Sequence, residues 1–400
     1  MKNLRMQQEM TDRGRLEIRV NARIQARPVS GARVTVSYTG DPQNVIEELI
    51  TDGDGRTETL DLATPPLEYS LEPNVNQPYS EYTVKVEAEG YEPVEVTGSE
   101  LLSGEQSVQQ VDLKLAEGAA FADVTIPDHT LFGEYPAKIP ESEIKPTWES
   151  GEIVLSRVVI PEYVVVHDGA PTDSTARDYY VRYRDYIKNV ACSEIYATWP
   201  DAAIRANILA IMSFTLNRVY TEWYRNKGYD FTITSSTAYD HKWIYGRNIF
   251  DSISLVVDEI FADYLSRPNV KQPILTQYCD GNRVSCPNWM SQWGSKNLAD
   301  QGYSTIQILR NYYGDNMYIN TAEEISGIPS SWPGYDLTIG SSGNKVLQMQ
   351  EQLNVIAEVY SSIPTVYENG YFDEETQDAV EAFQRGAALP VSAIGVFRTG

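Results

Sequence analysis

The period of the hydrophobic pattern changes along the chain, and this change requires more than one folding unit. Between residues 15 and 116, short runs such as residues 16–20 and 33–36 alternate apolar and polar side chains, as strands with one buried face do. After Asp173, apolar residues recur at helical spacing instead. The chain has 400 residues, which exceeds one ordinary domain. The sequence therefore predicts a multidomain α+β protein of two or three domains.

The strand-like N-terminal part contains strong turn signals at residues 51–55 and at Gly90. We expect Asp52 and Asp54 to shape their turn, with calcium binding as the alternative, because aspartates in hairpin turns usually serve the turn itself. The order of strands and turns resembles the prealbumin-like β-sandwich of carboxypeptidase regulatory domains. We therefore predict an N-terminal tail at residues 1–14 and a β-sandwich at residues 15–116.

Residues 117–156 break both patterns. Prolines interrupt the segment and glutamates charge it, namely Pro127, Pro136, Pro140, Pro146, Glu141, Glu143, Glu149 and Glu152. No periodicity is maintained for long. We predict an exposed linker that lacks regular structure and is open to proteolysis.

Helical spacing marks the central part, residues 157–325. A first helix is expected from Asp173 or Ser174 to about Tyr196, and a second begins at Pro200, a favoured first-turn residue. Further predicted elements are a strand at residues 231–234, a helix at about 251–265 and helical structure around a turn at about 297–313.

The last unit, residues 336–400, contains two predicted helices. Residues 344–360 place Val346, Met349 and Leu353 on one face, and a second helix begins after Asp373, which is a good N-cap. The chain stops soon after this helix, at Gly400, so the unit looks incomplete.

The net charge of −24 argues against nucleic acid and against an anionic membrane surface as partners, because both are negatively charged. No apolar run reaches the roughly 18 residues of a membrane span, and the N-terminal residues do not read as a signal peptide. The 27 tyrosines and seven tryptophans suit a polymer that is bound by hydrogen bonds and ring stacking.

Glu194 is the most informative single residue. It lies four residues after Val190, on the apolar face of the first central helix. Burial there disfavours the charged carboxylate and favours a protonated acid, which glycosidic cleavage needs. Because the next helix begins at Pro200, we expect Glu194 at a corner between helices, where a cleft can form. The competing interpretation is a glutamate near a helix end that points to water.

The cysteines and histidines leave several possibilities open. Cys279 and Cys286 suit a disulfide-closed hairpin, half of a metal site, or two buried thiols. With three histidines in the whole chain, there is little room for a zinc site or for a Cys–His pair such as Cys192 with His241. No G-x-S-x-G, H-E-x-x-H or phosphate-loop motif is present. We predict no metal and no cofactor.

Two ordered motifs in the central part resemble the stage II sporulation protein D family. The first comprises residues 193–200 and continues through residues 203–207, and the second comprises short runs between residues 290 and 314. In that family a glutamate followed by a Trp-Pro helix start carries catalysis, so the resemblance implies that Glu194 is the catalytic residue. The candidates for the wall of the cleft are Tyr239, Asp240, Tyr245, Gln292 and Trp293.

The C-terminal unit resembles a peptidoglycan-binding module of the three-helix type. The matching residues include Gly343, Val346, Gln350, Leu353, Phe372, Asp373, Thr376 and Phe383. A sandwich, a linker, a catalytic domain and a binding module in this order are similar to the clostridial spore cortex-lytic enzymes. This resemblance implies a zymogen that is synthesised in the mother cell, stored in the spore cortex or coat, and trimmed by a germination serine protease. We expect the cut between about Pro140 and Pro161.

The family chemistry is lytic transglycosylation of peptidoglycan. An acid protonates the oxygen between muramic acid and glucosamine, and the 6-hydroxyl of the same muramic acid then attacks C1. Because no water attacks, a second carboxylate is not required as it is in hydrolysis. Two features depart from the families: Cys286 and its neighbours replace a Gly-His-Gly segment, and residues 391–400 do not resemble the third helix of the binding module.

Two alternatives remain. An amidase would cut the bond between muramic acid and the stem peptide, but that chemistry usually needs a metal with histidine ligands. A non-catalytic spore wall-binding protein would need neither carboxylate nor metal.

Overall fold

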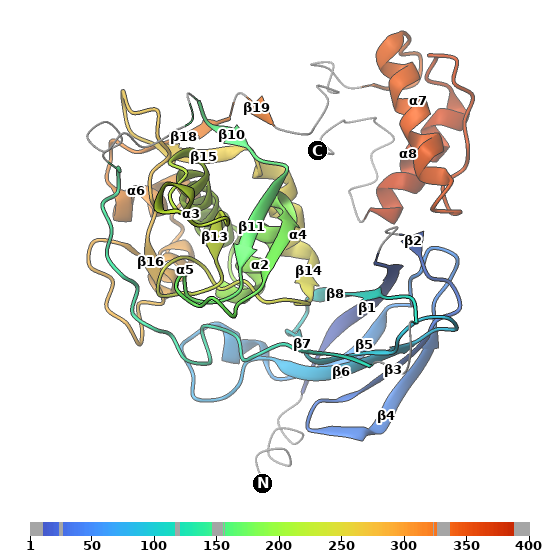
Figure 1. Cartoon of the computed structure of the whole chain (residues 1–400), viewed down its shortest axis with the longest axis horizontal. Helices are drawn as coiled ribbons and strands as arrows, with labels where there is room; N and C mark the ends of the chain where they lie inside the picture. Colours follow the sequence, from blue (N-terminus) through green and yellow to red (C-terminus); the bar gives the residue numbers. More distant parts are fainter. Residues whose placement is uncertain are drawn as a thin grey trace.

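The computed structural model describes residues 11–23, 27–116, 121–145, 155, 157–322, 324–325 and 337–387. It contains a β-sandwich, a central α+β unit and a small helical unit (Figure 1). The chain is therefore a multidomain α+β protein, as its two hydrophobic periods predict. Within the described residues, none of the helices is both long and apolar enough to span a lipid bilayer.

The N-terminal unit consists of two packed sheets. One sheet has the order β14-β8-β1-β2, with β5 also paired to β1, and the other has the order β4-β3-β6-β7-β9. Inward-facing side chains alternate along the strands, so Leu16, Ile18 and Val20 of one sheet and Val34 and Val36 of the other are fully buried. The strands of the N-terminal chain segment are β1 (Asp12–Ala22), β2 (Arg27–Pro28), β3 (Arg33–Tyr38), β4 (Asp41–Ile50), β5 (Leu60–Thr64), β6 (Ser80–Glu87), β7 (Val94–Leu101) and β8 (Gln106–Leu113), and a short 3-10 helix spans Leu67–Ser70.

Both sheets extend beyond residue 116. Strand β9 (Ala122–Thr125) pairs in parallel with β7, and β14 (Ile249–Phe250) from the central unit pairs with β8. After β9 the chain stays packed, with Leu131 and Tyr135 buried. The predicted lack of regular structure holds for residues 126–145, which contain no helix or strand, but the predicted exposure is wrong because single side chains anchor the segment in the core. Such anchors, and a four-residue strand before them, leave no periodic signal.

The central unit is built around α3 (Asp201–Tyr220). Sixteen of its twenty residues are buried, so it lies inside the unit rather than on its surface. The other elements are β10 (Val159–Ile160), β11 (Tyr163–His167), β12 (Asp178–Arg182), α2 (Tyr183–Glu194), a 3-10 helix (Arg225–Lys227), β13 (Ile233–Thr234), α4 (Asp251–Ile260), β15 (Asp263–Ser266), β16 (Tyr278–Cys279), β17 (Met290–Ser291), α5 (Gln292–Asp300), α6 (Thr305–Tyr313), β18 (Tyr318–Thr321) and β19 (Glu324–Ile325).

The first central helix begins later than predicted. Asp173 does not cap it, because its carboxylate accepts hydrogen bonds from the backbone and hydroxyl of Thr175 in a turn. Residues 178–182 form β12, which pairs with β11 in a hairpin, and α2 begins only at Tyr183. Over a segment of five residues, the spacing of apolar residues is compatible with either a helix or a strand.

A buried ion pair joins the sandwich to the central unit. The Arg247 guanidinium donates to both carboxylate oxygens of Glu100, at 2.9 and 2.6 Å, and both side chains are almost fully buried. Next to them, the Asn248 side chain bonds both the amide and the carbonyl of Glu100. These contacts add directional hydrogen bonds to the β14–β8 pairing.

The C-terminal unit consists of α7 (Asn344–Ala357) and α8 (Glu374–Gly386), packed over a core that includes Val346, Leu353 and Phe372. Asp373 caps α8 as predicted, because its side chain accepts from the amide of Thr376. Most of the region predicted to lack the third helix, including residues 391–400, lies outside the described residues.

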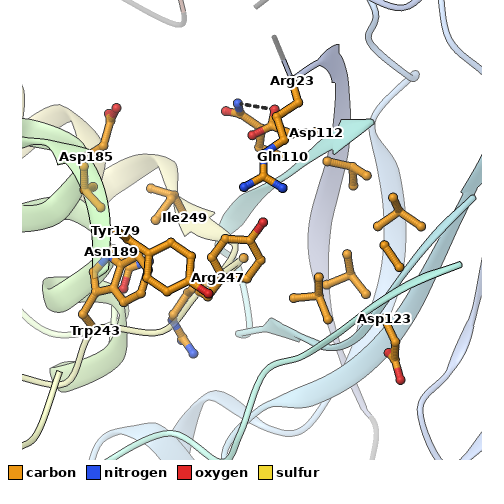
Figure 2. A pocket seen from close by; sticks show the side chains of 18 of the residues that line it. Arg23, Gln110, Asp112, Asp123, Tyr179, Asp185, Asn189, Trp243, Arg247 and Ile249 are labelled. Atoms are coloured by element: carbon orange, nitrogen blue, oxygen red, sulfur yellow. Dashed lines mark hydrogen bonds between the residues drawn. The ribbon is translucent and has the colours of Figure 1, made fainter. Parts of the chain in front are cut away.

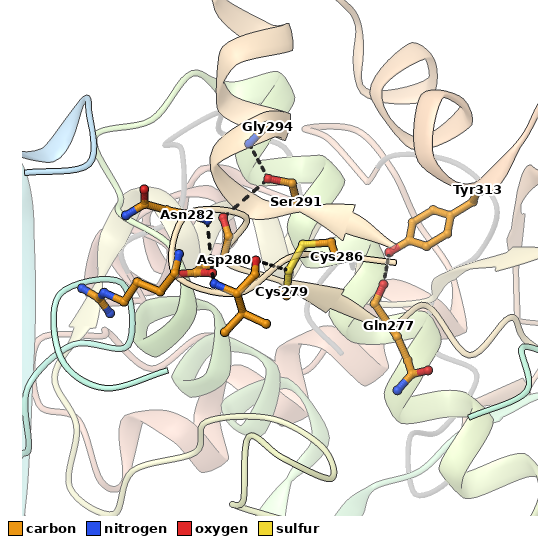
Figure 3. The surroundings of a disulfide bond; sticks show 10 residues. Gln277, Cys279, Asp280, Asn282, Cys286, Ser291, Gly294 and Tyr313 are labelled. Carbon is orange, nitrogen blue, oxygen red and sulfur yellow. Dashed lines mark hydrogen bonds between the residues drawn. A yellow bond between two sulfur atoms is a disulfide. The ribbon is translucent and has the colours of Figure 1, made fainter. Parts of the chain in front are cut away.

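Cys279 and Cys286 form a disulfide, with Cα atoms 5.6 Å apart (Figure 3). Of the three possibilities that the sequence leaves open, the structure therefore selects the closed hairpin. The Asp280 carboxylate accepts from the backbone amides of Asn282, Arg283 and Val284, and this shapes the loop between the cysteines. Within the described residues, no three His, Cys, Asp or Glu side chains are grouped to hold a metal ion.

The Glu100–Arg247 pair should be essential to the junction of the two units. We expect Glu100→Gln to lower the free energy of unfolding by about 3–5 kcal/mol, because it leaves the buried Arg247 charge without its partner. The matched control is Glu48→Gln, which removes an exposed partner of Arg33 and should leave the urea midpoint nearly unchanged, because water screens this pair. Equal urea midpoints for the two variants would contradict this.

The disulfide should stabilise a local loop only. Changing both Cys279 and Cys286 to Ser should cost about 2–3 kcal/mol, since the closed loop is short and Asp280 still holds its backbone. Thermal unfolding of the wild type with and without reductant should reproduce that difference. Loss of stoichiometric metal from the double variant would show instead that the cysteines are ligands.

Candidate functional site

Glu194 is the last residue of α2 and is fully buried. Its Oε1 accepts a hydrogen bond from the backbone amide of Lys242 at 2.8 Å, and its Oε2 accepts one from Gln292 Nε2 at 3.1 Å. The same Gln292 nitrogen donates to the backbone carbonyl of Glu194 at 3.0 Å. Glu194 thus lies at the predicted corner, but its carboxyl group is held by two donors and does not face an open cleft.

The two sequence motifs meet at this corner. Gln292 is the first residue of α5 and lies 98 positions after Glu194 in the sequence. Asn207 on α3 donates to Ser295 Oγ on α5 at 2.8 Å. The rings of Trp199 and Trp293 pack with their centroids 4.9 Å apart. Of the five candidate cleft residues, Gln292 bonds Glu194 directly, and Trp293 packs against Tyr196 and Trp199.

Lys138 brings a positive charge to the neighbourhood of Glu194. Its ammonium donates to the backbone carbonyl of Asp240 and lies 4.6 Å from the centroid of the Tyr278 ring. Burial lowers the pKa of Lys138, and the negative charges of Glu194 and Asp240 oppose that shift. Lys138 therefore places a buried amino group between two carboxylates of the corner, Glu194 and Asp240.

Two tyrosine hydroxyls also surround Glu194. Burial raises the pKa of Tyr135 and of Tyr278 well above the usual value, and the charge of Glu194 adds to both shifts. Neither hydroxyl has a hydrogen-bond partner among the described residues. Both are therefore neutral donors without acceptors, a costly state that a bound sugar or water would relieve.

Asp240, a predicted cleft residue, is a structural carboxylate. It is fully buried and accepts from Arg218 Nε at 2.8 Å and from the Tyr224 hydroxyl at 2.6 Å. The amide and hydroxyl of Thr234 satisfy it further. The Asp240 carboxylate is thus fully paired within the protein, and its place in the wall of a cleft stays a prediction.

The remaining two candidates lie elsewhere. The carbonyl of Tyr239 accepts from Arg218 Nη2 at 3.2 Å, so Tyr239 belongs to the Arg218–Asp240 region. Tyr245 is 36% exposed and stacks near Tyr179 and Trp243 at the junction with the sandwich. Neither touches Glu194.

A segment that the sequence predicts to be linker covers the corner. We call residues 129–145 the cover segment. The amide of Thr130 donates to the carbonyl of Ser193 at 3.4 Å, and the amide of Ile139 donates to the carbonyl of Ala238 at 2.8 Å. Tyr135 and Lys138 lie between these two anchors. Sequence reasoning missed both residues because nothing in the local pattern marks a segment that is anchored by long-range contacts.

Charged side chains fix the far end of the cover segment. Both carboxylate oxygens of Glu141 accept from the Arg218 guanidinium, at 2.6 and 3.0 Å. Burial alone would raise the pKa of Glu141, but Arg218 and Lys145 lower it to about 2. A second ion pair, between Arg267 and Glu143, also anchors this end of the cover segment.

The sequence possibility of a Cys192–His241 pair is wrong. Burial raises the pKa of Cys192 to about 12, and its sulfur accepts from the backbone amide of Phe250. His241 Nδ1 bonds the Tyr186 hydroxyl at 3.0 Å. Each side chain has another partner, and the thiol stays protonated.

Comparison with known proteins supports one part of the chain. Residues 342–395 match the family of peptidoglycan binding domains. A peptidoglycan-binding domain is therefore present near the C-terminus, as predicted, and it indicates association with the cell wall. No curated protein matches the chain.

Solved structures give only weak likenesses. The Bacillus anthracis TIE protein is 18% identical, with 26% of this chain and 17% of that chain covered and a TM-score of 0.19. The minor pilin GBS52 of Streptococcus agalactiae is 12% identical, covering 30% and 49%, with a TM-score of 0.19. The 5-hydroxyisourate hydrolase of Klebsiella pneumoniae is 14% identical, covering 26% and 91%, with a TM-score of 0.18. The matched part spans less than half of the first two chains, and at these TM-scores no argument rests on them.

Proposed function

We propose that this chain is a lytic transglycosylase that cleaves the glycan strands of spore cortex peptidoglycan during germination. The peptidoglycan-binding domain at residues 342–395 supports this proposal, because it would hold the chain on peptidoglycan, the substrate of this activity. The observation that carries the proposal is the hydrogen bond from Gln292 to Glu194, because it joins a residue of the second motif to the carboxyl group of the first across 98 positions of sequence. Residues that are far apart in the sequence can act on one substrate only if the fold brings them into contact.

In this proposal Glu194 acts first as an acid. Its carboxyl proton passes to the glycosidic oxygen as the bond from that oxygen to C1 of muramic acid breaks. The 6-hydroxyl of the same muramic acid then forms a bond to C1, and its proton returns to the Glu194 carboxylate. The products are a free glucosamine 4-hydroxyl end and a 1,6-anhydro muramic end, and no water is consumed. Gln292 and the amide of Lys242 orient the carboxyl group.

We further propose that the intact chain is a zymogen. Glu194 is fully buried and the cover segment lies against it, so a glycan strand has no path to the carboxyl group in this state. A cut after the cover segment would leave it, with the sandwich, attached by non-covalent contacts alone. The predicted interval from Pro140 to Pro161 fits this scheme. Its described first residues, 140–145, are anchored, and residues 146–154 lie outside the described part of the chain.

One observation favours a second candidate, a wall-binding protein without catalysis. Glu194 is fully buried, both of its carboxyl oxygens accept hydrogen bonds, and Lys138 lies nearby, so protein groups enclose the carboxyl group on the sides that a substrate would need. An opened cover segment would remove Lys138, whereas a non-catalytic protein would keep the arrangement permanently. The amidase alternative gains no support, because the described residues hold no cluster of metal ligands.

The central prediction concerns Glu194→Gln. The variant cannot deliver a proton, so lysis by the cut protein should fall by roughly 10²–10⁴-fold. Its stability should fall by about 1–3 kcal/mol, because Gln292 can accept from the new amide only after a flip that gives up its donation to the Glu194 backbone carbonyl. Exposed Glu162→Gln is the control.

Mass spectrometry of digested cortex separates the candidates. Anhydro-muramic ends that disappear in Glu194→Gln support the transglycosylase. Free stem peptides would identify an amidase, and intact glycan with bound protein would identify the wall-binding alternative.

The zymogen proposal predicts that loosening the cover segment activates the uncut chain. Glu141→Gln removes the charge bound to Arg218, which keeps Asp240 as its partner, so the fold should survive. A loss of about 1.4 kcal/mol from the closed state would raise the open population, and the rate of cortex lysis, about tenfold. Glu134 is exposed in the same segment, and Glu134→Gln should leave the rate of cortex lysis unchanged.

The same anchor sets a pH dependence. Because the pKa of Glu141 is lowered to about 2, its contribution to closure is complete above its ordinary value of 4.5 and is lost as the pH falls toward 2.

Limited proteolysis, N-terminal sequencing and a turbidity assay should show a cut form that lyses cortex faster than the intact chain. Equal rates for both forms would refute the zymogen proposal.

A further inference from the structure

A pocket of about 430 Å³ lies between the sandwich and the central unit. Figure 2 shows Tyr179 and Trp243 of the central unit on one side and Arg23, Gln110 and Asp112 of the sandwich on the other. A pocket of this size accommodates a ligand of one or two sugar rings. It is separate from the buried corner around Glu194.

Three aromatic rings form one wall of the pocket. The centroid of Tyr179 lies 5.2 Å from that of Trp243 and 5.0 Å from that of Tyr245, and Trp243 and Tyr245 are 6.4 Å apart. Tyr245 is 36% exposed although it is a large aromatic side chain. Such a cluster offers flat apolar faces with polar edges, which suits the apolar face of a sugar ring.

Buried donors without acceptors line the same pocket. Trp243 is 6% exposed and its Nε1 has no hydrogen-bond partner among the described residues. Arg247 is 4% exposed, and although its terminal nitrogens bind Glu100, its Nε is likewise unpaired. An unpaired buried donor is costly, and a ligand with amide or hydroxyl oxygens would satisfy it.

Charged side chains of both signs line the rim of the pocket. Arg23, Lys114 and Arg177 lie there together with Glu92, Asp112, Asp123 and Asp185, so the rim does not select for a ligand of one charge. Recognition therefore rests on the aromatic faces and the unpaired N–H donors, which match a sugar that carries acetamido groups. That is the chemistry of a muropeptide, in which N-acetylated sugars carry a lactyl-linked peptide.

The pocket and Glu194 share one loop. The amide of Lys242 binds the Glu194 carboxylate, and the next residue, Trp243, lines the pocket. Asn189 on α2 holds this loop by bonding both the amide and the carbonyl of Ile244. A ligand in the pocket is therefore bound by the same rigid support that carries the candidate catalytic group.

We propose that this junction pocket is a second muropeptide-binding site, distinct from the C-terminal peptidoglycan-binding domain. It deepens the proposed function and shares its substrate class, but it requires no catalysis. Because its walls come from both units, the site is complete only in the intact chain.

Calorimetry with the intact chain and a purified disaccharide tetrapeptide, N-acetylglucosaminyl-N-acetylmuramic acid with its peptide, tests the proposal. This fragment lacks the bond that the transglycosylase would cut. We expect Tyr179→Ala to weaken binding about tenfold through lost ring contact. Tyr180→Ala, the next residue on β12 but 77% exposed and outside the pocket, should bind as the wild type does.

Two further variants keep the proposal testable if Tyr179→Ala does not fold. Tyr245→Ala changes a partly exposed ring and should also weaken binding about tenfold. Trp243→Phe keeps an aromatic face but removes the unpaired N–H, and should weaken binding about fivefold. Unchanged binding in Tyr179→Ala and Tyr245→Ala, or no binding by the wild type, would overturn the proposal. Pocket binding by a chain that leaves cortex glycan intact would instead refute the transglycosylase and keep this site.

Discussion

The buried ion pair between Arg218 and Asp240 organises the functional half of this molecule. Arg218 projects from the central helix α3 with no exposure, and Asp240 begins the loop that carries Lys242, Trp243 and Arg247. Tyr224 and Thr234 fill the remaining positions on the carboxylate. A buried pair is tolerated only when its hydrogen bonds are complete, and here they are. Removing Arg218 would leave the buried Asp240 carboxylate without its cation and loosen the loop, whereas Arg218 itself would keep Glu141 as a partner.

Three separate features depend on that loop. The amide of Lys242 orients Glu194, the ring of Trp243 lines the junction pocket, and Arg247 joins the central unit to Glu100 of the sandwich. Arg218 also binds Glu141 and thereby closes the cover segment. One buried cation thus connects the candidate catalytic group, the junction and the cover. These contacts tie residues 129–145 and the sandwich to the loop that binds Glu194.

The closed state explains an apparent contradiction in the site. Two hydrogen bonds orient the Glu194 carboxyl group as a catalytic group would need, yet the side chain is fully buried and the cover segment lies against it. Orientation and burial are compatible if the covered state is a stored form. Lys138 and Tyr135 would then leave with the cover segment and open a path to the carboxyl group.

The sequence by itself determined the hydrophobic periods, the helix starts that depend on local capping, such as Asp373, and the position of Glu194 on the apolar face of its helix. Those features are local, so their signals lie within a few residues of one another. The tertiary structure alone decided that Gln292 reaches Glu194, that the Asp240 carboxylate is fully paired within the protein, and that residues 129–145 form a cover instead of a linker. Each of these depends on contacts across tens to hundreds of residues. Such contacts arise when buried polar groups must find partners, and the chain's local pattern does not record which partners they find.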